Sequence, residues 1–180
     1  MTPPAAEDDT GAQGFLSHLV ELRSRLLRAV AVVLVLALAL IPIGNRLYTL
    51  IAAPLLSKLP VGAQMIAIDP ASPFFTPLKL SFFVALIIAM PFVLYQIWAF
   101  VAPGLYRREQ RLAVPLLISS TLLFYLGCAF AYYFVLPTVF GFMQSVAPDG
   151  VAVMTDISLY LDFVLVIFLA FGVTFEVPVA

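Results

Sequence analysis

The chain has 180 residues, of which 63% are hydrophobic and only 11% are charged. Soluble domains average about 45–50% apolar and about 25% charged residues, so this composition indicates a membrane protein of one domain and excludes a soluble class. The formal net charge is -1, and the basic residues are scattered apart from those at loop ends, which gives no support for binding nucleic acid.

The N-terminal residues 1–14 are acidic and rich in Pro, Gly and Ala, so we expect a disordered cytoplasmic tail there. Residues 15–28 repeat apolar side chains at helical spacing, which predicts an amphipathic helix that lies partly among the lipid headgroups. Arg23, Arg25 and Arg28 precede the first apolar run and place this end in the cytoplasm by the positive-inside rule. The simpler explanation is that these arginines only anchor this topology.

Four apolar segments are long enough to cross a membrane, because about 20 helical residues span the hydrocarbon core of roughly 30 Å. We expect the spans at residues 26–44, 75–102, 112–136 and 159–180. The loop 103–111 carries three arginines and is therefore predicted to be cytoplasmic. Loops 45–73 and 137–158 then lie on the periplasmic side. The predicted fold is an all-α, polytopic membrane helix bundle.

Both outer loops carry apolar pieces that are too short to span the membrane. Residues 47–59, interrupted by Pro54, predict one or two short surface helices, and residues 138–146 predict another. Lys79, near the outer end of the second span, is expected to extend its ammonium group to the lipid headgroups. Pro91 predicts a kink in the same span, because proline removes one helical hydrogen bond.

Catalysis and cofactor binding have no support in the sequence. The single cysteine, Cys128, lies in an apolar run, and the single histidine, His18, has no imidazole or thiol near it in sequence, so neither predicts a metal site. The sequence has no Gly-rich phosphate loop, catalytic triad or nucleophile elbow. We therefore expect no enzyme, no metal and no organic cofactor.

Four stretches form a recognisable set: residues 18–26 (HLVELRSRL), 69–75 (DPASPFF), 95–106 (YQIWAFVAPGLY, followed by Glu109) and 171–178 (FGVTFEVP). In this order they resemble the TatC family, the polytopic core subunits of the bacterial twin-arginine protein translocase. The resemblance implies a transmembrane domain over residues 15–180. It also implies a family fold of six spans with both termini in the cytoplasm, of which this chain reaches only the fourth span.

The same resemblance implies a function. The chain would be a receptor that binds twin-arginine signal peptides at the cytoplasmic face of the bacterial inner membrane. It would support export of folded proteins, driven by the proton-motive force. The implied partners are the single-span subunits TatB and TatA, further copies of the chain in the receptor complex, and membrane lipid.

Glu21 and Glu109 are the acids that lie beside the two points where the chain enters the membrane from the cytoplasm. Carboxylates bind the planar guanidinium group through short charge-assisted hydrogen bonds, which suits a peptide with paired arginines. By resemblance, both belong to the signal-peptide-binding site together with Arg23 and Phe100. We expect Arg23 and Arg107 to orient the carboxylates. From the pattern alone, each glutamate is a solvated partner of a nearby arginine.

Three further residues match family positions. Glu176 lies deep in the fourth apolar segment, where an ionisable side chain costs about 2.5–3.5 kcal/mol on insertion scales. We expect it to face the bundle interior or a wet groove, and the resemblance links it to translocation; a polar hydrogen bond between helices is the alternative. Pro54 in the outer loop and Phe74 at the start of the second span also match, but a break in a surface helix is a structural alternative for Pro54, and packing is one for Phe74 and for Phe100.

Two other functions stay open at this point. A proton-coupled or ion-coupled transporter would use Glu176, with Asp162, and would need more ionisable groups and broken helices within the membrane. A structural scaffold would tolerate neutralisation of both Glu21 and Glu109.

Overall fold

The computed structural model describes residues 8–57, 64–101, 113–146 and 154–178. Its elements are α1 (Asp8–Leu40), the 3₁₀ turn η1 (Ile41–Ile43), α2 (Gly44–Leu56), α3 (Ser72–Val101), α4 (Ala113–Phe130), the π-helical turn η4 (Ala131–Val135), α5 (Leu136–Val146) and α6 (Ile157–Glu176). Four continuous helical segments within these residues are long and apolar enough to cross a membrane: His18–Leu56, Ser72–Phe100, Val114–Val146 and Ile157–Glu176. The predicted all-α bundle with four spans is therefore confirmed.

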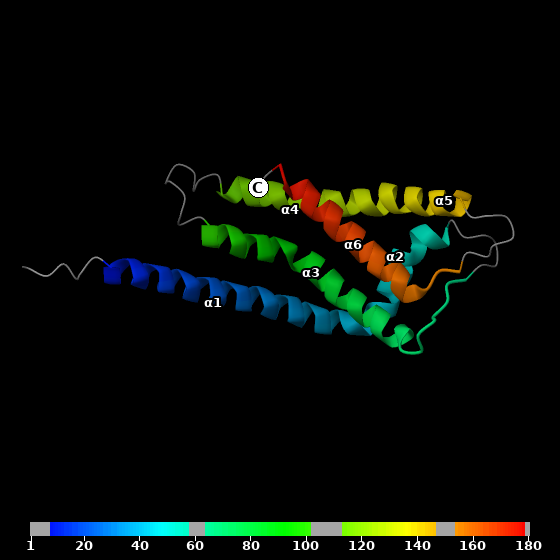
Figure 1. Cartoon of the computed structure of the whole chain (residues 1–180), viewed down its shortest axis with the longest axis horizontal. Coiled ribbons are helices and arrows are strands. Elements are labelled where there is room, and N and C mark those ends of the chain that lie inside the picture. The colour runs from blue at the N-terminus through cyan, green and yellow to red at the C-terminus, as the bar shows by residue number, and fades with distance from the viewer. Residues whose placement is uncertain (1–7, 58–63, 102–112, 147–153, 179–180) are drawn as a thin grey trace, which may run out of the picture.

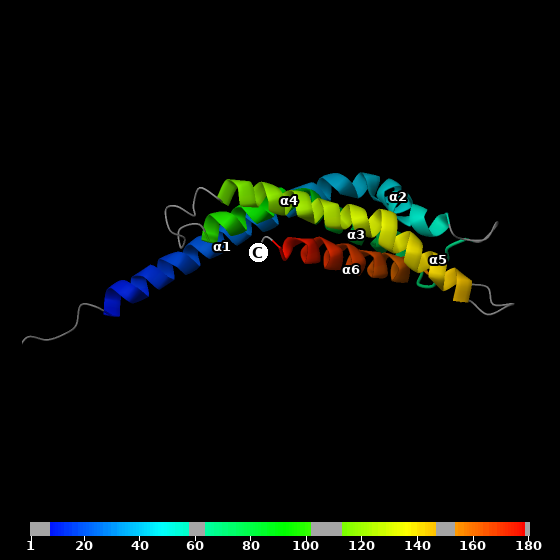
Figure 2. The same cartoon turned by 90° about the horizontal axis from the view of Figure 1, so that it is seen from above.

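Two helix pairs dominate the packing. α1 lies along α3, and α6 packs chiefly against α4 while crossing it obliquely (Figure 1). Figure 2 shows α6 on one side of α3 and α4. We call the end that carries α2 the outer end, and the end that carries the last turn of α3 and the first turn of α4 the inner end.

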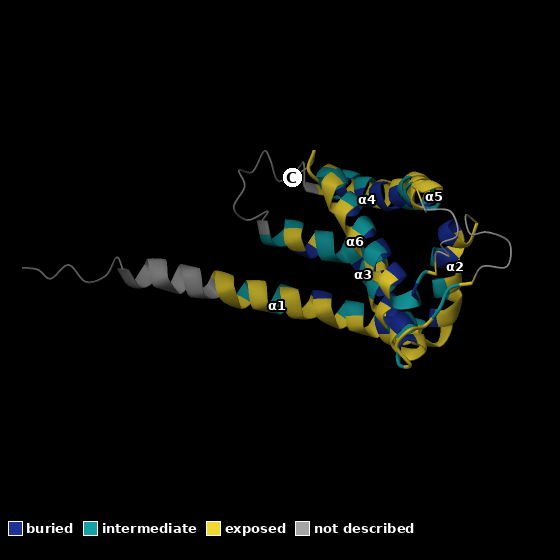
Figure 3. Ribbon diagram, turned by 45° about the vertical axis from the view of Figure 1, so that its right-hand side comes forward, coloured by how far each residue is buried: buried dark blue, intermediate teal, exposed yellow. Residues whose placement is uncertain are grey.

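Burial is uneven along the bundle. Most of the described side chains of α1, from His18 onward, are exposed, and the buried residues gather where α2, α4 and α6 meet (Figure 3). The core cluster consists of Ala52, Leu55, Phe124, Cys128, Ala131, Leu136, Phe140, Tyr160, Val164 and Phe168. Exposed apolar side chains such as Val35 and Leu38 on α1 suit contact with lipid tails, which need no water-facing polar surface.

Two glycines allow α4 and α6 to approach closely. A Cβ atom on Gly127 would lie 2.6 Å from the backbone oxygen of Phe171, and one on Gly172 would lie 2.7 Å from the ring of Phe124. Small residues at such positions let membrane helices pack with their backbones in near contact. This pair of glycines therefore fixes the crossing point of the two helices.

The structure corrects three of the predicted boundaries. α1 begins at Asp8, so the prediction of a disordered tail is wrong for residues 8–14. The helix can extend this far because no proline follows Pro4 in this stretch and each added helical residue gains one backbone hydrogen bond. The third helical segment does not end at residue 136 but continues through α5 to Val146. α6 covers Ile157–Glu176 rather than residues 159–180.

The continuation of the third segment has a local cause at Pro137. Proline lacks the backbone N–H and its ring crowds the carbonyl of the preceding turn, which usually bends or ends a helix. Here the preceding turn, η4, widens into a π-helical geometry, and the chain then resumes an α-helix. The short helix expected at residues 138–146 is thus an extension of the membrane helix and not a separate surface helix.

Asp156 ties the two outer connections together. Its Oδ1 accepts hydrogen bonds from the backbone N–H groups of Ser158 (2.9 Å) and Leu159 (3.0 Å), which caps the start of α6. Its Oδ2 accepts from the backbone N–H of Ile68 at 2.9 Å. A parallel bridge adds the bonds Ile66 N to Thr155 O (3.0 Å) and Ile157 N to Ile66 O (2.9 Å). One buried carboxylate therefore positions both the start of α6 and the segment that leads into α3.

Candidate functional site

The inner end holds a polar and aromatic cluster between α1 and α3, which we call the inner cluster. It comprises His18, Glu21 and Arg25 on α1 and Gln96 and Phe100 on α3. The α1 members stand at positions i, i+3 and i+7, which places them on one helix face. Because that face packs on α3, the long α1–α3 contact brings these five residues together.

Arg25 connects the two helices within this cluster. Its Nε and Nη2 donate to Oε1 of Glu21 at 3.0 and 2.6 Å, and its Nη1 donates to Oε1 of Gln96 at 3.4 Å. The side chains of Arg25 and Glu21 are 22% and 41% exposed, and Gln96 is buried. Both short contacts end on one carboxylate oxygen, so Arg25 does not engage Oε2 of Glu21.

An aromatic contact closes the cluster on the side of the N-terminus. The rings of His18 and Phe100 are stacked, with centroids 4.2 Å apart and planes inclined by 22°. Phe100 is partly buried, whereas His18 is exposed. Along this face of α1, Glu21 therefore stands between His18, which stacks on Phe100, and Arg25, which binds its carboxylate.

The structure corrects which arginine orients Glu21. Residues two apart on a helix point to different faces, whereas residues four apart lie on the same face. Arg25 is thus the partner of Glu21, and the expectation that Arg23 orients this carboxylate is wrong. Glu109 and Arg107, the other residues expected to act here, lie outside the described residues.

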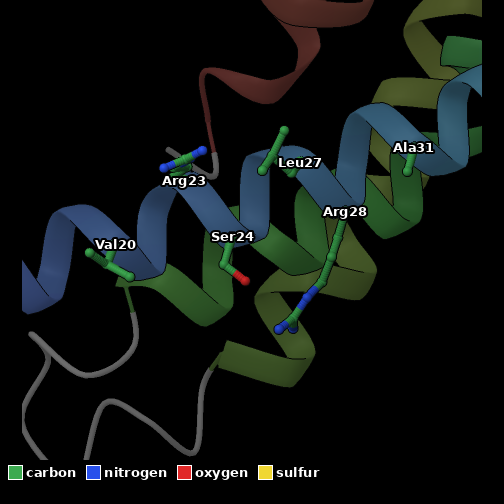
Figure 4. A pocket seen from close by; sticks show the side chains of 6 residues that line it. All are labelled: Val20, Arg23, Ser24, Leu27, Arg28 and Ala31. Atoms are coloured by element: carbon green, nitrogen blue, oxygen red, sulfur yellow. The ribbon is translucent and has the colours of Figure 1, made fainter.

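Arg23 lines an open groove on another face of α1. The groove has a volume of about 500 Å³ and is lined by Val20, Arg23, Ser24, Leu27, Arg28 and Ala31 (Figure 4). Arg23 and Arg28 point to different sides of the helix in this view. The two arginines thus bracket a mainly apolar surface beside the inner cluster.

Glu176 is the last residue of α6 and contacts α4. Its Oε1 is buried and has no hydrogen-bond partner among the residues that the structure describes. The buried hydroxyl of Ser120 on α4 lies close to this carboxyl group. Ser120 lies seven residues after the start of α4, or about 10 Å along the helix at roughly 1.5 Å per residue. The carboxylate is therefore held at an interior position away from the inner cluster.

Comparison with known proteins decides the family. The family model described as Sec-independent protein translocase protein (TatC) matches residues 17–180. The chain belongs to the TatC family. It is 57% identical over 168 residues to the Sec-independent protein translocase protein TatC of Escherichia coli strain K12, covering 93% of this chain and 65% of that protein. It thus spans just under two thirds of that relative's length.

Other members give the same result. The Haemophilus influenzae protein of the same description is 56% identical over 169 residues, covering 94% of this chain and 66% of that protein. A crystal structure described as the twin arginine translocase receptor TatC is 37% identical, with a TM-score of 0.77 and coverage of 90% of this chain and 72% of that one. The crystal structure of that receptor in DDM is 35% identical, with a TM-score of 0.80 and the same coverage.

The remaining TatC-like positions lie at the outer end. Pro54 is buried within α2, and Phe74 is 69% exposed at the start of α3, where its ring meets that of Phe75 edge-on at 5.2 Å. Phe74 and Gln96 are 22 residues apart on α3, which is about 33 Å at roughly 1.5 Å per residue. The structure therefore separates the outer positions from the inner cluster by the length of the bundle.

Sequence reasoning missed one ion pair. Nζ of Lys79 on α3 lies 2.6 Å from Oδ1 of Asp162 on α6, and both side chains are 49% exposed. Lys79 is the only charged residue of α3, and Asp162 is one of only two in α6, which is the signal that could have suggested the pair. Because Asp162 already has a cationic partner, it is a poor candidate for a coupling carboxylate. Among the described residues no group of three His, Cys, Asp or Glu side chains could hold a metal ion.

Proposed function

We propose that this chain is the receptor part of a twin-arginine protein translocase and that Glu21 binds an arginine of the signal peptide. The observation that carries the proposal is the state of Glu21: a half-exposed carboxylate at the inner end, with Arg25 on one oxygen only. Membership of the TatC family and the description of the similar crystal structures as a twin arginine translocase receptor support it.

The chemistry of the inner cluster suits a peptide guanidinium. A carboxylate accepts a guanidinium through charge-assisted hydrogen bonds, and Oε2 of Glu21 has no hydrogen-bond partner among the described residues. The stacked rings of His18 and Phe100 lie beside it and offer a face on which a guanidinium or an apolar side chain can rest. The resemblance adds Glu109 as the second carboxylate and Arg23 as a further member of the site.

The same proposal sets the orientation and the location. Arg23, Arg25 and Arg28 at the inner end favour the cytoplasm for that end by the positive-inside rule. The N-terminus and loop 103–111 are then cytoplasmic, and the outer end, which holds the segments expected as loops 45–73 and 137–158, is periplasmic in a bacterial inner membrane. Signal peptides of this class are read as addresses from the cytoplasm, so the receptor carboxylates belong on that face.

The further parts of the proposal concern the whole translocase. TatB and TatA are the proposed single-span partners, with self-association of the receptor subunits, and the proton-motive force drives export of folded cargo. Glu176 is proposed to act in the translocation groove, and Pro54 and Phe74 to shape the outer end. Within the described part of the chain Oε1 of Glu176 has no partner, which favours this role, because a buried acceptor without a donor is costly to keep.

Site-specific photocrosslinking tests the receptor role. A photoreactive residue at position 21 or 109 is expected to capture a signal peptide with Arg-Arg and to capture the Lys-Lys version much less. A photoreactive residue at position 35, on the exposed face of α1 in the middle of its span, serves as the control and is expected to capture neither. Equal capture of both peptides at position 21, or none, contradicts the proposal.

A further inference from the structure

The contact between Arg25 and Glu21 resembles the contact that the proposed function asks an incoming arginine to make. Arg25 approaches the carboxylate with Nε and Nη2, the edge of the guanidinium group that binds carboxylates. The two residues are four apart on α1, and the pair is partly exposed, which makes it weak and dependent on salt. A second guanidinium group can therefore compete with Arg25 for Glu21.

Gln96 gives Arg25 a second place to bind. Its side chain is buried on α3, and its Oε1 already accepts from Nη1 of Arg25 at 3.4 Å. This acceptor meets the opposite edge of the same guanidinium group, so Arg25 can leave Glu21 without losing every partner. A charged group that moves to a partly buried position needs such an acceptor, because burying a charge without a hydrogen-bond partner costs free energy.

We propose that Arg25 is an internal competitor for Glu21. A peptide arginine must displace Arg25 or share the carboxylate with it, and Gln96 binds Arg25 when it moves. This inference rests on the proposed function, because it assumes that Glu21 binds the signal peptide. Its consequence is selectivity. A guanidinium group can bind both carboxylate oxygens and outcompete Arg25, whereas the compact ammonium group of lysine makes a point contact and competes poorly.

The competitor model predicts opposite effects for two nearby substitutions. Arg25→Gln removes the competitor, so binding of a Lys-Lys peptide is expected to rise more than binding of an Arg-Arg peptide. The preference for Arg-Arg is expected to shrink about 1.5- to 5-fold, the range that corresponds to an exposed ion pair. Gln96→Leu removes the alternative acceptor, so Arg-Arg binding is expected to weaken while the preference is retained.

The experiment measures both peptides on the same membranes. Vesicles that carry the protein with its translocase partners are titrated with fluorescent Arg-Arg and Lys-Lys signal peptides at low and high salt. Arg28→Gln is the matched control, because it removes the same charge from α1 one turn away, in the neighbouring groove. It is expected to alter both affinities equally. Arg25→Lys, which keeps the charge without the fork, is expected to give an intermediate preference.

Two outcomes would overturn the inference, and they differ. If Arg25→Gln lowers the affinity for both peptides in parallel, Arg25 only positions Glu21, and the competitor model is wrong while the receptor function stands. If Glu21→Gln leaves Arg-Arg binding unchanged, Glu21 does not bind the peptide, and the proposed function of the site fails together with the inference.

Discussion

The hydroxyl of Tyr132 donates a 2.7 Å hydrogen bond to the backbone carbonyl of Leu50. That carbonyl is the one that Pro54, four residues later in α2, cannot satisfy, because proline has no N–H. The same arrangement occurs in α3. Pro91 provides no N–H for the carbonyl of Ile87, and the hydroxyl of Tyr125 donates to that carbonyl at 3.0 Å. Tyrosines of the third helical segment thus satisfy acceptors that two prolines expose in the neighbouring helices.

Tyr132→Phe is the first test of this relationship. The substitution leaves the Leu50 carbonyl without this donor and is expected to lower the free energy of unfolding by about 0.5–1.5 kcal/mol, the net contribution of a typical hydrogen bond. In a Pro54→Ala background the new N–H of residue 54 can satisfy Leu50, so the same substitution is expected to cost less. Denaturant titration in detergent measures the cycle, with Tyr133→Phe at an exposed neighbour as the control. Additive effects would show that the two residues are not coupled.

Loss of charge at the receptor carboxylates is the second test. Glu21→Gln removes an anion that charge-assisted bonds would use, and such bonds contribute about 1.5–3 kcal/mol, so Arg-Arg peptide affinity is expected to fall about tenfold or more. Glu109→Gln is expected to act in the same direction. Peptide binding and export of a twin-arginine reporter measure the effect, and membrane insertion of each variant is checked in parallel. Normal export by both variants would remove the assignment and favour a structural scaffold.

The apolar spans were predictable because the lipid core demands about 20 helical residues that satisfy their own backbone, whatever the tertiary packing. The partner of Glu21 was also readable, since Arg25 stands four residues later and Arg23 only two. The link from Asp156 to Ile68 could not be predicted from the sequence, because it joins residues 88 apart through a contact between two loops. The continuation beyond Pro137 was missed because a π-helical turn absorbs the proline, and no local pattern announces this.

The cap at Asp156 makes the outer end sensitive to acid. The backbone N–H of Ile68, followed by those of Leu159 and Ser158, holds the pKa of Asp156 below its ordinary value, against the opposing effect of burial. The stabilisation is therefore complete above the unfolded pKa of about 3.9 and is lost as the pH falls through the lower folded value. Unfolding midpoints measured in detergent from about pH 7 to about pH 3 are expected to drop at the acid end.

Asp156→Asn is the control for that pH dependence. Asparagine also caps helices through its side-chain oxygen but carries no charge, so the variant is expected to keep the cap and lose part of the acid sensitivity. If wild type and variant show the same acid dependence, another group causes it, and the role of Asp156 is limited to geometry.

The two glycines at the α4–α6 crossing are expected to differ in their tolerance of a methyl group. At Gly127 the new Cβ would meet the backbone of Phe171, which cannot move without shifting α6, whereas at Gly172 it would meet the ring of Phe124. Gly127→Ala is therefore expected to cost about 1–3 kcal/mol and more than Gly172→Ala. Gly141→Ala, where nothing lies within 4 Å, is the control. Thermal unfolding in detergent ranks the three, and equal stability would contradict the close packing.

Two substitutions of Glu176 can distinguish a role of its charge from a role of its hydrogen bonding. Glutamine at this position keeps an oxygen that can accept from Ser120 but removes the ionisable group, whereas alanine removes both. If the charge acts in translocation, Glu176→Gln and Glu176→Ala are both expected to lose most export of a twin-arginine reporter while the protein still inserts. If the carboxyl only joins α6 to α4, Glu176→Gln is expected to export normally, and Ser120→Ala to reproduce the alanine defect. We expect the first result, because a helix contact alone does not explain why Oε1 is buried without a partner among the described residues.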